Sequence, residues 1–268
     1  MTPRPRLILI SGWAHDSSAM ENLRQCLENA VEVSVAATGD LWSPAAAGRA
    51  PSAYARGLAQ LIEKNGGKVF LAGWSLGGMI ALETAAWRPE IADGLILIST
   101  TAKFLANENW TAGVSAGALR AMSAMLKRNP RRVFTDFFQK AACNFEEKIQ
   151  GLGIKNRATA GLESIALKIE RACAMNPLEL SAGLEYLAET DLRSAAAQIN
   201  IPALVLHGRH DAIMPVDAGL ALKNILPASE INVYENCGHG LPWQNPRAIA
   251  GDIMEFLEKC GRRPGFCA

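Results

Sequence analysis

Six short apolar runs, separated by stretches of helical periodicity, constrain the fold of this chain most strongly. None of the runs alternates strictly between apolar and polar residues, which is typical of strands that are covered on both faces. The runs are Arg6–Ser11, Val31–Ala37, Lys68–Trp74, Gly94–Ser99, Ala203–Gly208 and Glu230–Tyr234. The helical stretches between and after them are Ser18–Asn29, Ser52–Asn65, Met79–Trp87, Val216–Leu226 and Pro246–Lys259. This order predicts an α/β fold, with a mainly parallel sheet of about six strands and helices on both faces.

The alternation stops between about Thr101 and Asn200, where only helical patterns occur. These patterns cover Ala116–Arg128, Arg131–Cys143, Ala158–Arg171 and Leu178–Glu189. We therefore expect residues 1–100 and 201–268 to form the α/β core, and residues 101–200 to form a helical lid over the strand ends. The alternative is a separate helical domain with its own role.

The composition excludes several functional classes. The 268 residues include 27 Lys and Arg against 26 Asp and Glu, and a net charge of +1 gives no case for nucleic acid or an anionic membrane as a partner. No apolar run approaches the roughly 20 residues of a membrane span, so we expect a soluble, cytoplasmic protein. The six cysteines contain no C-x-x-C pair and are expected to be reduced; Cys237, near His239, is interpreted as a small buried residue. There is no H-E-x-x-H motif, and we expect neither a metal nor a cofactor.

A serine lies between glycines at the point where the third apolar run meets a helical pattern. Residues 73–77 read Gly-Trp-Ser-Leu-Gly, which fits G-x-S-x-G between a strand and a helix. In such a turn small neighbours avoid steric clashes, and the serine hydroxyl projects from the sheet edge. The pattern therefore predicts Ser75 as a nucleophile; the alternative is a tight turn that happens to hold a serine.

A serine hydroxyl needs a base, and the chain offers four histidines. Only His239, in the loop after the last apolar run, fits the order Ser…Asp…His of a nucleophile-elbow enzyme. Asp211 follows the preceding run and is expected to orient the imidazole, with Asp217 as the alternative acid; Asp217 is more simply explained as a helix cap. For His207 and His210 we favour a structural role.

The tetrahedral intermediate of acyl transfer needs two N–H donors. One is the backbone N–H of Leu76, directly after the serine, and the other comes from the loop after the first strand, "SGWAHD". Gly12 allows the chain to turn there, which makes the Trp13 N–H the candidate. The alternative is a plain strand-to-helix loop.

The segments "SGWAHD", "GWSLGG", "HGRHD" and "GHG", in this order, resemble the α/β-hydrolase superfamily. "GWSLGGMIAL" with "LISTTAKF", and "GLEYLAETDLRSAAAQINIPALVLHGRHDAIMP", further resemble the pimeloyl-[acyl-carrier protein] methyl ester esterases of biotin synthesis. The resemblance implies a catalytic triad of Ser75, Asp211 and His239 and oxyanion donors at Trp13 and Leu76. It also implies a substrate-binding lid aromatic at Phe137. Members of the family often carry His-Gly-Trp-Gly where this chain has Ser-Gly-Trp-Ala at residues 11–14.

The resemblance further implies an acyl ester substrate that is carried on acyl carrier protein. Carrier proteins are acidic, and four basic residues lie within "LKRNPRR" of the expected lid, where they offer a docking surface. These residues are Lys127, Arg128, Arg131 and Arg132. The alternative is a solvated helix end, because cations favour a helix C-terminus.

The leading hypothesis is therefore a serine carboxylesterase that removes the methyl group of pimeloyl-acyl carrier protein through an acyl-enzyme. A second hypothesis keeps the triad and changes the substrate: a thioesterase, a small-ester carboxylesterase or a menaquinone-pathway lyase. A third, from another class, is a catalytically silent binding protein with the same architecture.

Overall fold

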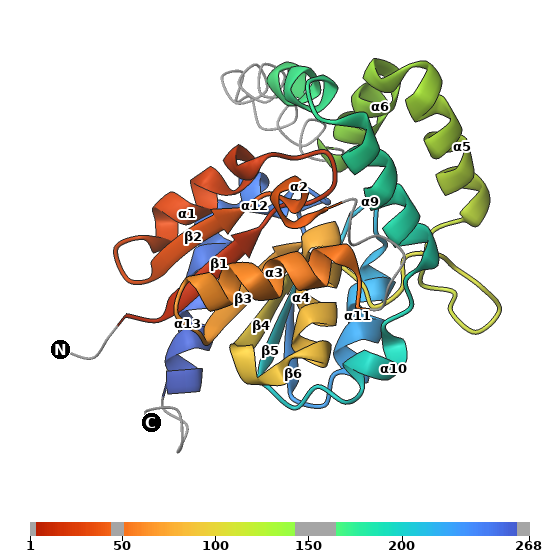
Figure 1. Cartoon of the computed structure of the whole chain (residues 1–268). Helices are drawn as coiled ribbons and strands as arrows, with labels where there is room; N and C mark the ends of the chain where they lie inside the picture. Colours follow the sequence, from red (N-terminus) through yellow and green to blue (C-terminus); the bar gives the residue numbers. More distant parts are fainter. Residues whose placement is uncertain (1–3, 44–50, 143–164, 262–268) are drawn as a thin grey trace.

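The computed structural model describes residues 4–43, 51–142 and 165–261, which form a six-stranded sheet with helices around it (Figure 1). The strands are β1 (Arg6–Ile10), β2 (Glu32–Ala36), β3 (Val69–Trp74), β4 (Ala92–Ile98), β5 (Ala203–Gly208) and β6 (Ser229–Tyr234). They pair in the order β2-β1-β3-β4-β5-β6, and all five pairings are parallel. The fold class that the sequence predicts is therefore confirmed.

Helices cover both faces of the sheet. Successive strand residues point to opposite sides, and because these strands are apolar on both sides, each face needs its own layer of helices. In β1, Leu7 and Leu9 face the core formed with α1 (Glu21–Leu27) and α13 (Pro246–Gly261). Ile8 and Ile10 face the other core, formed with α3 (Ala53–Lys64), α4 (Leu76–Trp87) and α11 (Val216–Ile225). The shorter described elements of the α/β part are η1 (Ser17–Met20), α2 (Thr38–Leu41), η3 (Pro89–Ile91) and α12 (Leu241–Gln244).

The chain between β4 and β5, which we call the insertion, is mainly helical in its described part. Its described helices are α5 (Ala116–Arg128), α6 (Pro130–Ala142), residues 165–173, α9 (Pro177–Glu189) and α10 (Arg193–Ala196). The predicted helix Ala158–Arg171 lies partly outside the described residues. Figure 1 shows α5, α6 and α9 together on one side of the sheet. Arg171 reaches back to the core, with its Nε 3.8 Å from Asp16 Oδ2.

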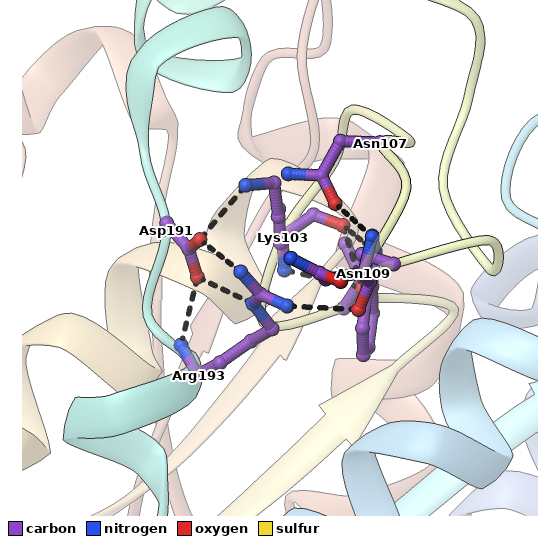
Figure 2. Close-up of polar contacts among 7 residues, drawn as sticks. Lys103, Asn107, Asn109, Asp191 and Arg193 are labelled. Atoms are coloured by element: carbon purple, nitrogen blue, oxygen red, sulfur yellow. Dashed lines mark hydrogen bonds and ion pairs between the residues drawn. The ribbon is translucent and has the colours of Figure 1, made fainter.

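The two ends of the insertion are tied together at a polar neck (Figure 2). Lys103 and Asp191 form an isolated antiparallel bridge, and Lys103 Nζ lies 2.8 Å from Asp191 Oδ2. Arg193 donates three further hydrogen bonds to the same carboxylate, two from its guanidinium at 2.9 and 2.7 Å and one from its backbone N–H at 3.2 Å. Its guanidinium also donates to the Asn109 carbonyl and lies 5.6 Å from the centre of the Trp110 ring. The neck fixes where the insertion leaves and re-enters the sheet.

Four of the six cysteines lie in the described part of the chain, namely Cys26, Cys173, Cys237 and Cys260, and all four are free thiols. Cys237 is buried, and burial raises the pKa of its thiol. Cys143 and Cys267 lie outside the described residues. Among residues 4–43, 51–142 and 165–261, no helix has the length and apolar character that crossing a bilayer requires.

Candidate active site

Ser75 occupies a strained turn between β3 and α4. Its φ of 55° lies in the left-handed region, which residues with a Cβ rarely adopt. Hydrogen bonds to its backbone hold the turn. Ser75 N–H donates to the Ile98 carbonyl at 2.9 Å, and the Ser75 carbonyl accepts from Gly78 N–H at 3.0 Å, from Met79 N–H at 3.3 Å and from Thr100 Oγ1 at 2.7 Å. Ser75 is partly exposed, whereas both of its neighbours are buried. The geometry therefore presents the serine at the sheet edge.

The glycines around Ser75 are explained by close backbone approaches. A Cβ at Gly73 would lie 2.3 Å from the Gly77 carbonyl oxygen, and one at Gly77 would lie 2.4 Å from the Ser11 carbonyl oxygen. Real Cβ atoms do not approach backbone so closely, so larger residues at either position would push β3, α4 and the loop after β1 apart. The G-x-S-x-G spacing is thus a packing requirement of this turn.

Asp211 and His239 meet at the same edge of the sheet, after β5 and β6. His239 Nδ1 lies 2.7 Å from Asp211 Oδ2, and both side chains are fully buried. The other carboxylate oxygen, Oδ1, accepts the N–H groups of Ile213 and Met214 at 2.9 and 2.8 Å. Since an ionised carboxylate only accepts hydrogen bonds, Nδ1 carries the proton and Nε2 keeps its lone pair. Nε2 of His239 is buried and has no hydrogen-bond partner within the described structure.

The other aspartate and histidines considered for the triad do not take part in the pair of Asp211 and His239. Asp217 stands in the first turn of α11, and the residue at the N-cap position is Pro215, so the interpretation of Asp217 as the cap is wrong. His207 is fully buried, and its Nε2 donates to the Met214 carbonyl at 2.9 Å while lying 3.5 Å from Asp211 Oδ2. Burial lowers the pKa of His207. His210 is exposed, next to Asp211.

Trp13 and Leu76 adjoin each other beneath α9. Leu76 is the first residue of α4, so its N–H has no carbonyl within the helix to bond. The Trp13 indole donates to the Leu180 carbonyl of α9 at 2.9 Å. A Cβ at Gly183, one turn further along α9, would lie 2.6 Å from Trp13 Cδ1 and 3.4 Å from Leu76 Cδ2. The insertion therefore packs directly on both residues.

Phe137 of α6 lies in the same aromatic cluster. Its ring centre is 5.3 Å from that of Trp13 and 6.4 Å from that of His239, in both cases nearly edge-on. The basic residues of "LKRNPRR" lie elsewhere, at the exposed junction of α5 and α6. There Arg131 pairs with Glu170 at 2.5 Å, and Arg132 lies 3.9 Å from Asp136.

Sequence reasoning gave no role to three residues that shape this site. Trp74 donates its indole N–H to the His239 carbonyl at 2.9 Å and so ties the histidine loop to the residue before Ser75. Thr100 bonds the Ser75 carbonyl, as described above. His15, buried behind Trp13, donates to the Trp13 carbonyl at 2.7 Å. Each of these residues lies in a segment that the sequence analysis quotes, but its hydrogen-bond partner was not evident. The partner of Trp74 lies 165 residues away along the chain, and that of Thr100 lies 25 residues away.

Comparison with known families shows which protein family this chain belongs to. The model of the "alpha/beta hydrolase fold" family matches residues 52–246, a range that holds Ser75, Asp211 and His239. The chain belongs to the α/β-hydrolase family. Its insertion between β4 and β5 lies inside the matched range.

Relatives of this α/β-hydrolase include two named pimeloyl-[acyl-carrier protein] methyl ester esterases. That of Aromatoleum aromaticum is 31% identical, over 95% of this chain and 98% of the relative. That of Vibrio vulnificus is 25% identical, over 95% of each chain. Among solved structures, a bromoperoxidase from Bacillus anthracis superposes with a TM-score of 0.81 at 17% identity, covering 96% of this chain and 92% of that one. An esterase from Exiguobacterium antarcticum superposes with a TM-score of 0.78 at 16% identity, covering 96% and 93%. These two structures share the fold of this α/β-hydrolase.

Proposed function

We propose that this α/β-hydrolase is a serine carboxylesterase that hydrolyses the methyl ester of pimeloyl-acyl carrier protein in biotin synthesis. The observation that carries the mechanism is the buried pair of Asp211 and His239, with His239 Nε2 left free at the edge where Ser75 is presented. The substrate follows from the relatives that carry that name and align over nearly the whole chain.

In the proposed reaction Ser75 Oγ attacks the ester carbonyl carbon while His239 Nε2 takes the hydroxyl proton. The tetrahedral intermediate places its negative oxygen at the N–H groups of Trp13 and Leu76, and one such donor contributes on the order of 3 kcal/mol. The C–O bond to the methoxy group then breaks, and His239 returns the proton so that methanol leaves. Water, deprotonated by His239, attacks the acyl-enzyme and releases the free carboxylate and Ser75. Asp211 holds the imidazole and stabilises its charged form.

The insertion acts as the lid in this proposal. Phe137 supports that role, because its ring lies against both Trp13 and His239, where an acyl chain bound to Ser75 would pass. The exposed basic residues at the α5–α6 junction are proposed to dock the acidic carrier protein. Of these, Lys127 and Arg128 have no ion pair with any described residue, and their charge is available to a partner.

The decisive experiment incubates methyl-pimeloyl carrier protein with wild type and with Ser75→Ala and weighs the products by mass spectrometry. Loss of only the methyl ester, by wild type alone, is expected. Release of the whole acyl chain would make the protein a thioesterase. No reaction, with turnover of simple aryl esters, would discard the carrier-bound substrate and keep the mechanism. Ligand binding without any turnover would favour a non-catalytic binding protein.

Docking is tested separately with Lys127→Glu/Arg128→Glu. This variant is expected to raise KM for the carrier-bound ester and to leave KM for a free methyl ester unchanged. The matched control is Lys64→Glu/Lys68→Glu, an exposed pair at the opposite edge of the sheet, since Lys68 directly precedes β3. Equal effects of the two double variants on the carrier-bound ester would show that only overall charge matters.

A further inference from the structure

The loop after β1 contains a second strained residue. Ala14 has a φ of 58°, in the left-handed region, and it directly follows Trp13. An alanine in this conformation brings its Cβ close to the backbone, so the conformation costs free energy and needs support from its surroundings. The other positive-φ residues with a Cβ among those described are Ser75 and Ser99, both at strand ends of the same sheet edge. The question is what holds Ala14.

His15 supplies that support through a hydrogen bond that spans Ala14. Its Nδ1 lies 2.7 Å from the Trp13 carbonyl oxygen, and since a carbonyl only accepts, Nδ1 donates. The loop is also pinned through the backbone of His15, because Ser11 Oγ donates to the His15 carbonyl at 3.0 Å. Side chain and backbone of His15 thus close two small rings, and Ala14 lies in both.

The surroundings of His15 suit a neutral, fixed imidazole. The residue is 4% exposed, and its ring centre lies 4.4 Å from that of Trp74 and 5.0 Å from that of Phe138. Burial lowers the pKa of His15 to about 3, and the positive charge of Lys168 adds to the effect. Its Nε2 is buried and unpartnered within the described structure. The bond to Trp13 is therefore the polar contact that this buried ring makes.

We propose that His15 is a positioning residue for the oxyanion site, which holds Ala14 in the left-handed conformation and so directs the Trp13 N–H at the substrate carbonyl oxygen. The Trp13 carbonyl and the Trp13 N–H belong to adjacent peptide groups. When the carbonyl is held by His15, the backbone conformations open to Trp13 are restricted, and with them the directions of its N–H. The inference rests on the proposed function, because it assigns His15 a role only through the oxyanion donor Trp13.

Three variants test the inference. In His15→Asn the side-chain NH2 lies where Nδ1–H was and can still donate to the Trp13 carbonyl. His15→Leu fills the space without a donor. His15→Leu/Ala14→Gly adds a residue that adopts positive φ without strain. We expect His15→Leu to lower kcat about 10- to 100-fold with KM nearly unchanged, since a misdirected oxyanion donor loses part of its effect. His15→Asn is expected to keep most of the activity, and Ala14→Gly to restore part of what His15→Leu loses.

The deciding readout is the affinity for a trifluoromethyl ketone, whose adduct with a serine carries an oxyanion. This affinity should fall in His15→Leu in parallel with kcat/KM, and thermal unfolding verifies that each variant is folded. The inference is overturned if His15→Leu keeps wild-type kcat and inhibitor affinity, or if His15→Asn falls as far as His15→Leu. Failure of the proposed function gives a different result, namely that the wild type itself leaves the methyl ester of the carrier-bound substrate intact.

Discussion

The imidazole of His239 and the carboxylate of Asp211 form a pair with no exposed side-chain surface, and 2.7 Å separates Nδ1 from Oδ2. Asp211→Asn keeps an oxygen for the N–H groups of Ile213 and Met214 but replaces the acceptor facing His239 with an NH2 group. We expect the imidazole to change tautomer, so that Nε2 carries the proton, and kcat to fall on the order of 10³- to 10⁴-fold. Steady-state hydrolysis of a methyl ester, together with thermal unfolding, measures this.

The matched control for Asp211→Asn is Asp217→Asn. Asp217 lies in the first turn of α11, where losing the charge costs a few tenths of a kcal/mol and leaves kcat unchanged. A large loss of kcat in Asp217→Asn, with near-normal activity in Asp211→Asn, would show that Asp217 is the acid of the triad and that Asp211 is not.

Gly183 packs α9 against Trp13 and Leu76, the proposed oxyanion donors. Gly183→Ala would place a methyl group 2.6 Å from Trp13 Cδ1, so either Trp13 or α9 must move. We expect kcat for a methyl ester to fall about 10-fold or more, because a displaced donor stabilises the oxyanion less. The control is Gly251→Ala in α13, where the added Cβ meets nothing within 4 Å beyond the local helix backbone and its chain neighbours. This substitution should stabilise the fold by about 0.5–1 kcal/mol. Equal kcat values in the two variants would show that Trp13 tolerates the methyl group.

The buried His15 makes stability depend on pH. Its pKa falls from 6.5 to about 3 on folding, mainly through burial, so the unfolded chain binds a proton first as the pH drops. The contribution of neutral His15 to the free energy of unfolding is therefore complete above about pH 6.5 and is lost progressively between pH 6.5 and about pH 3. This histidine alone should lower the free energy of unfolding by about 2 kcal/mol between pH 8 and pH 5. Urea unfolding at both pH values measures the change.

His15→Asn removes the titrating group and should flatten that pH dependence. The slope that remains is expected to come in part from His207, whose pKa is also lowered by burial. An unchanged pH dependence in His15→Asn would mean that the pKa of His15 does not fall on folding.

The polar neck of the insertion gives a local prediction. Asp191 accepts from both Lys103 and Arg193, and the hydrogen bonds from Arg193 hold the pKa of Asp191 well below its usual range. Because the group is partly exposed, Asp191→Asn should change global stability by at most about 1 kcal/mol. Amide hydrogen exchange should nevertheless accelerate at residues 101–115 and 190–193. Glu90→Gln, which breaks the surface pair with Arg88, is the control and should leave exchange in the insertion unchanged. Uniform acceleration in both variants would contradict a local role.

The sequence predicted the sheet and its helices closely, since burial on both faces makes each strand a short, continuous apolar run. β5 begins and ends where expected, and α5 coincides with the predicted Ala116–Arg128. The helical pattern was predicted to start at Met79, whereas α4 starts three residues earlier, at Leu76. Glycine is unfavourable within a helix, so Gly77 and Gly78 add no helical signal. In the structure these glycines lie in the first turn of the helix, where backbone and Thr100 leave no space for side chains. Four-residue helices such as α2 and α12 were missed, since so short a segment shows no period.

The candidate site was less accessible to sequence reasoning than the fold. The pairing of Asp211 with His239 followed from chain order and parallel strand ends. The left-handed conformation of Ala14 and the hydrogen bond from His15 to the Trp13 carbonyl gave no signal, because backbone conformation in a loop depends on tertiary contacts. The contact between Trp13 and Leu180 joins segments 167 residues apart, which no local pattern encodes. Whether the insertion is a lid stays a prediction of the motif and its position.

The hydrogen bond from the Trp13 indole to the Leu180 carbonyl makes one residue serve two parts of the molecule. Its backbone N–H belongs to the proposed chemistry, while its side chain belongs to the packing of α9. An engineer who reshapes α9 to admit a different ester therefore also changes the geometry of charge stabilisation, without altering any group that reacts. Under the proposed chemistry, substrate range and turnover in this scaffold are linked through Trp13, and a library in α9 should yield altered selectivity together with altered rate.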